Sequence, residues 1–198
     1  MTRQARSDST RGRVLDGALE LFGETSSVEV PVRLLSARSG VSVGSIYHHF
    51  GDMAGVSAAL YSRCMCALLD HMLASVPAGG RLEALVGSTV RSYLDWTRRN
   101  ILEARFIHAS AFAPFAAAYR EDIRKEKAGR MERLAAALAA HTRSGGARAL
   151  PFFVLEMLVI GPVAETARRW LSGSPDADLD AAERHLPGRI LRSVRSGR

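Results

Sequence analysis

Side chains that could bind phosphate or the edge of a base gather in one short stretch of the sequence, residues 32–50, VRLLSARSGVSVGSIYHHF. Hydroxyl, imidazole and guanidinium groups donate hydrogen bonds to phosphate oxygens, and some of them also reach base edges in a DNA groove. A glycine among them lets another molecule approach the backbone closely. The candidates in this stretch are Arg33, Ser42, Val43, Gly44, Ser45, Tyr47, His48 and His49. Their chemistry is the non-covalent recognition of a nucleic acid.

Two short helices joined by a tight turn must position these side chains. Gly40 can take the left-handed conformation that ends a helix, and Ser42 suits the N-cap of the next helix. That second helix is predicted over residues 43–50, with Ile46 and Phe50 buried. The apolar set that can close a steep angle between the two helices is Val32, Leu35, Val41 and Ile46. The pattern is typical of a helix-turn-helix, although an ordinary helical hairpin in an all-α core also has it.

The flanking segments favour the helix-turn-helix. Upstream, TRGRVLDGALELFGE has the period of a helix, with Thr10 near its N-cap. Its apolar face consists of Val14, Leu15, Ala18, Leu21 and Phe22. Downstream, Gly51 and Asp52 interrupt the pattern before a long helix begins at about Met53.

From Thr10 to roughly Leu60 the chain resembles the DNA-binding domain of tetracycline-repressor-type regulators, the TetR family. The matching segments are TRGRVLDGALELF, Val32 with Arg33, GVSVGSIYHHF, and Asp52. The resemblance implies an all-α protein of about nine helices. It further implies a flexible basic arm over residues 1–9, a three-helix DNA-binding domain over 10–52, and a larger effector-binding and dimerisation domain over 53–198. Many members have lysine where this chain has Val43 and Met53, which puts two usual phosphate contacts in doubt.

Within the expected DNA-binding domain, the side chains divide into two groups. Arg11, Ser42, Ser45 and Tyr47 are expected to contact mainly phosphate. Arg33, Gly44 and His48 are the candidates near base edges, with phosphate an equal possibility for Arg33. The net charge is +7, yet Arg33 and Arg38 are the only arginine or lysine residues from position 14 to Phe50. We therefore expect affinity to depend on the N-terminal arginines and on helix N-termini.

The rest of the chain is predicted to be helical, in segments separated by proline and glycine. The expected helices cover residues 53–76, 82–99, 101–112, 115–141, 149–171 and 179–194. No run of about 18 apolar residues suggests a membrane span, so we expect a cytoplasmic protein. The segment LPFFVLEMLVIGPVAETARRWL is apolar on nearly all sides and must be covered. It is either a central core helix or, as the resemblance implies, half of a homodimer interface formed with the last helix.

The resemblance also implies a pocket for a small, largely apolar effector in the second domain. The expected lining consists of Tyr93, Trp96, Phe106, His108, Phe112, Tyr119, Phe153 and Met157. The resemblance further implies that effector binding moves the fourth helix and releases the operator, as in a ligand-responsive repressor.

Other functions have little support in the sequence. The six histidines are either adjacent or scattered, and no nucleophile, nucleotide or metal-ligand motif is present, so we expect no catalytic site, no metal and no cofactor. Cys64 and Cys66 point in different directions on a helix, which favours inert packing. The alternatives that stay open are an activator and a helical interaction protein whose DNA-binding domain does not act as an effector-released repressor.

Overall fold

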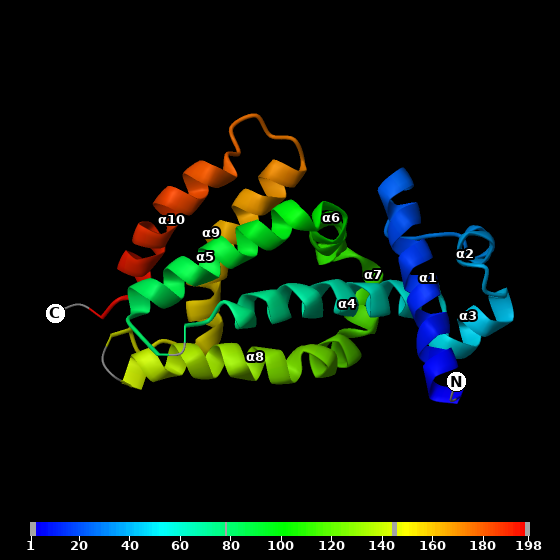
Figure 1. Ribbon diagram of the computed structural model, residues 1–198, viewed down its shortest axis with the longest axis horizontal. Coiled ribbons are helices and arrows are strands. Elements are labelled where there is room, and N and C mark those ends of the chain that lie inside the picture. Colours follow the sequence, from blue (N-terminus) through cyan, green and yellow to red (C-terminus); the bar gives the residue numbers. More distant parts are fainter. Residues whose placement is uncertain (1–2, 78, 144–145, 197–198) are drawn as a thin grey trace. The chain divides into compact units, whose positions relative to one another are not determined.

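The protein is all-α. The computed structural model describes residues 3–77, 79–143 and 146–196, and these form ten α-helices and a single 3-10 turn (Figure 1). In chain order the first five helices are α1 (Arg3–Thr25), α2 (Val32–Ser39), α3 (Val43–Phe50), α4 (Met53–Ala74) and α5 (Leu82–Arg99). They are followed by α6 (Ile101–Ala109), the 3-10 turn η1 (Ser110–Phe112), α7 (Pro114–Ala118), α8 (Arg120–Arg143), α9 (Phe152–Leu171) and α10 (Leu179–Val194). The predicted fold class is confirmed.

Two differences from the predicted helices have local causes. The segment from Arg3 to Thr10 contains no proline or glycine, and α1 continues through it. Residues 3–9 are therefore helical instead of a flexible arm, and Thr10 lies inside α1; residues 1–2 of the expected arm lie outside the described residues. The helix predicted over 115–141 is divided, because Tyr119 leaves helical geometry with φ −104° and ψ 20°. This break gives ten helices where nine were expected.

The described residues form two compact units. The first contains the residues up to Met65 together with Leu102–Lys127, and the second contains Cys66–Ile101 together with the residues from Ala128 on. This division runs through α4, and the functional boundary between residues 52 and 53 stays a prediction. The first half of α4, most of α6, and α7 pack in the same unit as the helix-turn-helix.

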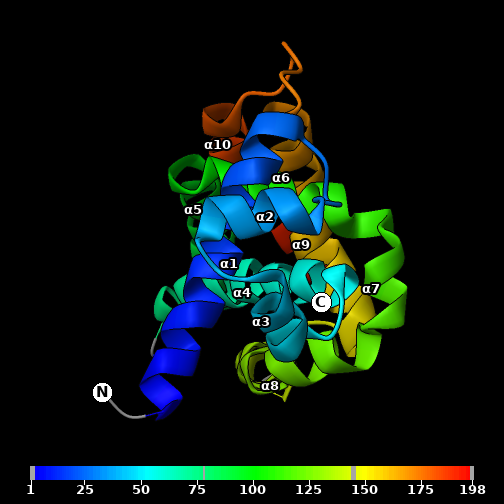
Figure 2. The ribbon, with the colours of Figure 1, turned by 90° about the vertical axis from the view of Figure 1, so that its right-hand side faces the viewer.

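The first unit has a core shared by α1, α2, α3 and α6. Figure 2 shows α2 and α3 next to α1. The Phe22 ring of α1 meets the Phe106 ring of α6 edge to face, with centroids 5.0 Å apart. The buried apolar residues of the three N-terminal helices and their turn are Val14, Leu15, Ala18, Leu21, Phe22, Leu35, Val41, Ile46 and Phe50. All of them were predicted as apolar packing residues, whereas Val32, which was also predicted, is half-buried.

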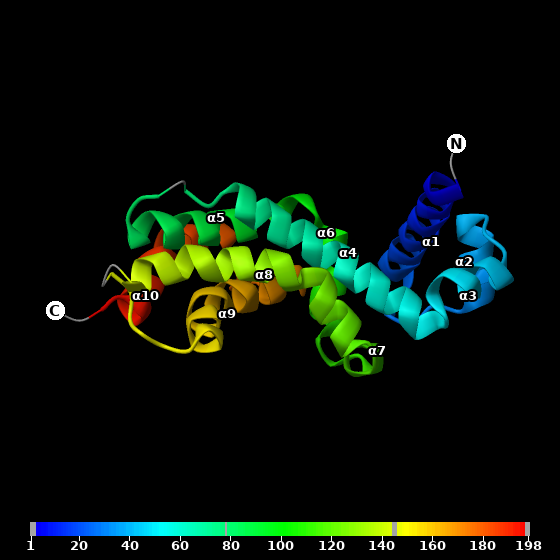
Figure 3. The same ribbon diagram turned by 90° about the horizontal axis from the view of Figure 1, so that it is seen from below.

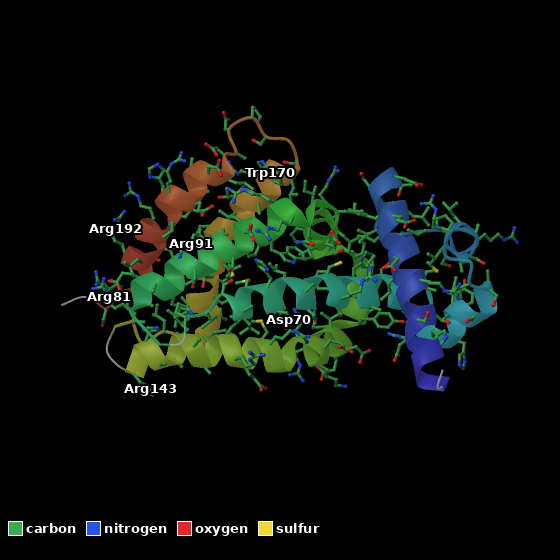
Figure 4. All side chains as sticks on the ribbon, in the orientation of Figure 1. Asp70, Arg81, Arg91, Arg143, Trp170 and Arg192 are labelled. Atoms are coloured by element: carbon green, nitrogen blue, oxygen red, sulfur yellow. The ribbon has the colours of Figure 1, made fainter. Side chains whose placement is uncertain are left out.

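The second unit is built around α5, which packs against both α9 and α10 (Figure 1, Figure 3). Arg98 of α5 donates to the carboxylates of Asp180 and Glu183 at the start of α10. Arg130 of α8 makes a two-bond pair with Asp70 of α4, which is labelled in Figure 4. No helix in the described part of the chain has both the length and the apolar character needed to cross a membrane.

Candidate nucleic-acid interface

The turn between α2 and α3 is closed by hydrogen bonds of its own residues. Gly40 takes the left-handed conformation, with φ 64° and ψ 26°, as predicted, and its N–H donates to the Ser36 carbonyl at 3.1 Å. The Ser36 hydroxyl donates to the Val41 carbonyl at 2.8 Å across the turn. Its hydrogen bond fixes the path of the chain into α3.

Ser42 caps the N-terminus of α3, as predicted. Its backbone is extended, and its hydroxyl oxygen accepts the Ser45 N–H at 3.3 Å. Accepting this bond uses a lone pair and leaves the O–H of Ser42 able to donate to another oxygen. Ile46 and Phe50 are buried, so the opposite side of the short helix is directed outward.

The outward side of α3 carries the predicted recognition residues. Gly44, Tyr47 and His48 are exposed, while Ser45 and His49 are half-buried. A Cβ built on Gly44 would meet no atom within 4 Å. Nothing within the chain therefore requires glycine at this position, and the backbone of α3 is open to another molecule here. We call Arg33, Gly44, Ser45, Tyr47 and His48 the reading surface.

Arg33 lies on the first turn of α2 and is exposed. Pro31 precedes this turn and has no side chain that could cap it. The Leu34 N–H donates to the Pro31 carbonyl at 3.0 Å, and the N–H groups that come before it have no carbonyl partner within the helix and favour an anion. Arg33 and the start of α2 could thus attract the same phosphate. The role of Arg33, at phosphate or at a base edge, stays a prediction.

Two other arginines of the N-terminal helices, Arg11 and Arg38, bind groups of the same chain. Arg11 of α1 donates to the His49 carbonyl at 2.8 Å, and its guanidinium lies 4.6 Å from the centre of the Phe50 ring. A cation stabilises the C-terminal end of a helix, so Arg11 ties α1 to the end of α3. Arg38 pairs with Glu24 and Glu20, and the hydrogen bond to Glu24 is the main cause that raises its pKa. Sequence reasoning missed the helix-binding role of Arg11.

The connection from α3 to α4 is a short turn, and its hydrogen bonds were not predicted from the sequence. Asp52 caps α4: its Oδ1 atom accepts the Gly55 N–H at 2.7 Å and the Tyr119 hydroxyl at 2.8 Å. These two bonds, that of Gly55 first, lower the pKa of the Asp52 carboxyl. A Cβ on Gly55 would lie only 2.0 Å from the Phe50 carbonyl oxygen. An aspartate just before a helical pattern is an N-cap signal that could have identified Asp52, but not its bond to Tyr119.

The residues predicted to line an effector pocket are divided between the two units. In the first unit Phe106 is buried, His108 is half-buried, and Phe112 is fully exposed. Tyr119 directs its hydroxyl to Asp52.

In the second unit Tyr93 and Trp96 of α5 are buried, whereas Phe153 and Met157 of α9 are each 66% exposed. The eight residues thus range from fully buried to fully exposed. The pocket itself stays a prediction.

The comparisons with known proteins agree with the geometry of the first unit. Residues 14–60 match the family described as bacterial regulatory proteins, tetR family. The match extends from the buried face of α1 through the helix-turn-helix into α4. No curated protein matches the chain.

Solved structures with a similar fold cover nearly the whole chain. A TetR family transcription regulator from Marinobacter aquaeolei VT8 has a TM-score of 0.78 and 18% identity, covering 99% of this chain and 100% of its own. The fatty acid degradation regulator FadR from Bacillus halodurans has a TM-score of 0.72 and 16% identity, over 91% of this chain and 94% of its own. FadR from Bacillus subtilis in complex with stearoyl-CoA has a TM-score of 0.74 and 16% identity, over 90% and 96% respectively.

Proposed function

We propose that this chain, a transcriptional regulator of the TetR family, is a dimeric repressor that leaves its operator when a small, largely apolar molecule binds the helices beyond α3. The reading surface is the observation that supports DNA binding in this proposal. A capped, exposed helix presents Gly44 to open space, and the turn before it is closed by its own hydrogen bonds. Such a rigid element can enter a major groove without rearrangement.

The roles of the individual side chains follow from their places on the reading surface. Gly44, near the N-terminus of α3, lets the backbone approach the floor of the groove. His48, one turn further on, is directed to base edges, as is Arg33 when α2 faces the groove. Tyr47 and Ser45 donate to phosphates from their hydroxyl groups, and so does Ser42, which lies beside this surface at the N-cap of α3.

In a single copy of the protein, few cations in and around the reading surface are available to bind phosphate. Arg38 is held by two carboxylates, Arg11 is tied to α3, and the lysines common in the family are replaced by Val43 and Met53. Since each phosphate contact by lysine or arginine adds to affinity and to its salt dependence, one copy binds weakly. Two copies about 34 Å apart reach successive major grooves, and linking them raises the effective concentration of the second. Dimerisation is thus central to the proposal.

Exposed apolar side chains on α9 support a dimer interface there. Phe153 and Met157 lie one turn apart and are each 66% exposed, and Phe152 beside them is 37% exposed. Further along α9, a Cβ on Gly161 would meet nothing within 4 Å, and the same holds for Gly188 of α10. Exposed large apolar residues and small residues on neighbouring helices suit a four-helix interface between two copies.

The effector proposal rests on aromatic residues and on a similar fold. One structural neighbour, FadR from Bacillus subtilis, was solved with stearoyl-CoA. We infer that this chain also takes a ligand with a large apolar part, and that Tyr93 and Trp96 of α5 are among the residues that line its site. Titration of apolar metabolites into the operator complex, followed by fluorescence anisotropy, would reveal release as a fall in anisotropy.

The replacement Gly44→Ala tests the DNA-binding part directly. We expect about tenfold weaker binding to the operator, because a methyl group would stand where the helix meets the bases. The free energy of unfolding should rise by about 0.5 to 1 kcal/mol, since alanine favours a helix and meets no neighbour. Anisotropy with labelled DNA from upstream of the gene measures the first effect, and urea unfolding measures the second.

Gly129→Ala is the matched control for Gly44→Ala. Gly129 lies on α8 with nothing within 4 Å of its missing Cβ, so the same gain in stability is expected with no effect on DNA binding. Operator binding by Gly44→Ala as tight as that of the unmodified chain would contradict the placement of α3 in the groove.

The replacement Met157→Glu tests the dimer. A carboxylate in an apolar interface is desolvated without a partner, so we expect the dimer to weaken by about a hundredfold and operator affinity to fall with it. Sedimentation velocity measures the oligomeric state. Phe112→Glu adds the same charge at a fully exposed aromatic residue outside α9 and should leave the state unchanged. Equal dimerisation of Met157→Glu and the unmodified chain would exclude this face of α9.

A further inference from the structure

Tyr119 reaches from the junction of α7 and α8 to the residue that follows the helix-turn-helix. Its hydroxyl donates to Oδ1 of Asp52 at 2.8 Å. The same oxygen accepts the Gly55 N–H in the first turn of α4. Gly51, which ends α3 with φ 80°, lies next to this contact, since its Cβ would be 3.9 Å from the Tyr119 hydroxyl. The Tyr119 hydroxyl therefore lies against the turn between α3 and α4 and is bonded to one of its residues.

The position of this hydroxyl is fixed by the packing around it. The Tyr119 N–H donates to the Phe115 carbonyl at 2.9 Å, and the Ile123 N–H donates to the Tyr119 carbonyl at 3.0 Å. Phe115 and Ile123 belong to a buried cluster that also includes Ala58 of α4, and the Tyr119 ring packs against it. The corner between α7 and α8 and the first turns of α4 thus share a core, so their relative position is defined in the compact unit.

We propose that Tyr119 is a positioning residue for DNA binding, whose hydroxyl holds Asp52 and thereby fixes the C-terminal end of α3. The inference rests on the proposed function, because it concerns the affinity of the reading surface. The end of α3 is held from one side by Arg11, through the His49 carbonyl, and from the other by the Asp52 turn. Without the Tyr119 hydroxyl, the Asp52 side chain is held only by N–H groups in the first turn of α4. The turn must then be ordered when DNA binds, which weakens binding.

The bond also has a spectroscopic signature that does not depend on DNA. The hydrogen bond to Asp52 raises the pKa of the Tyr119 phenol, and burial adds to this. Deprotonation of Tyr119 therefore requires a higher pH than that of an ordinary tyrosine. In Asp52→Asn the charged acceptor is lost, so the pKa of Tyr119 should move back toward its usual range. Absorbance of tyrosinate during alkaline titration of the full chain measures this change.

The test compares operator binding by the unmodified chain with that of Tyr119→Phe, which removes only the hydroxyl. We expect about three- to tenfold weaker binding, the range of a typical net hydrogen bond. Tyr61→Phe is the matched control, because Tyr61 packs in the same cluster against Phe115 and is not bonded to Asp52. Its operator affinity should stay unchanged. Circular dichroism and urea unfolding establish that each variant is folded.

A double-mutant cycle separates positioning through Asp52 from a general structural role. If Tyr119 acts through Asp52, the effects of Tyr119→Phe and Asp52→Asn on operator affinity are not additive. Additive effects, stronger binding by Tyr119→Phe, or unchanged binding by it would each overturn the inference while leaving the proposed function intact. Absence of any specific operator binding by the unmodified chain would overturn the proposed function, and the inference with it.

Discussion

We expect Phe106→Ala to lower the free energy of unfolding by about 3 to 5 kcal/mol, the range for removing a buried phenylalanine. Phe106 is 1% exposed in α6, and its ring meets the Phe22 ring of α1 at 5.0 Å with an interplanar angle of 88°. The edge-to-face geometry adds to the energy of burial. Alanine would leave a cavity between α1 and α6 that the neighbouring rings cannot fill.

The measurement is urea unfolding at equilibrium, and the matched control is Phe112→Ala. Phe112 is six positions further along and fully exposed, so its truncation removes no packing and should change stability by less than about 0.5 kcal/mol. Similar losses for the two variants would mean that the two aromatic side chains are equally buried. Phe106→Ala should also weaken operator binding, because α1 carries both Phe22 and the Arg11 contact to α3.

The contrast between Phe106 and Phe112 illustrates what the sequence could not predict. Both are aromatic residues of one short apolar segment, and both were expected to line a pocket. Their burial depends on where the helix ends: α6 stops at Ala109, and η1 then carries Phe112 outward. It depends also on α1, more than 80 residues earlier, which supplies the partner ring of Phe106. Neither factor has a signature within the segment.

The helix-turn-helix could be predicted because its signals are local. A left-handed glycine, an N-cap serine and apolar residues at helical spacing act within a few positions of one another, and Gly40, Ser42 and Ile46 all have the predicted conformation or burial. The contact that holds the C-terminal end of the helix-turn-helix could not be predicted in the same way. Asp52 and Tyr119 are 67 positions apart, and only the packing of α7 and α8 brings them together.

The other large effect is expected for Gly55→Ala, where two physical effects oppose each other. Gly55 is the third residue of α4, and helix propensity alone would predict a gain of about 1 kcal/mol from alanine. A Cβ there would lie 2.0 Å from the Phe50 carbonyl oxygen and 3.1 Å from the Tyr119 hydroxyl. The first atom belongs to the backbone and cannot rotate away. The end of α3 and the start of α4 must therefore separate, so we expect a net loss of about 3 kcal/mol or more.

Gly44→Ala provides the contrast, because it makes the same chemical change in the first turn of the neighbouring helix, where the Cβ meets nothing. Urea unfolding should therefore give opposite signs for the two variants, a loss for Gly55→Ala and a gain for Gly44→Ala. Operator binding should fall in both, in Gly44→Ala by contact with DNA and in Gly55→Ala by displacement of α3. A stabilised Gly55→Ala would show that the chain between Phe50 and α4 can shift freely. The Asp52 turn would then be too mobile to position the recognition helix.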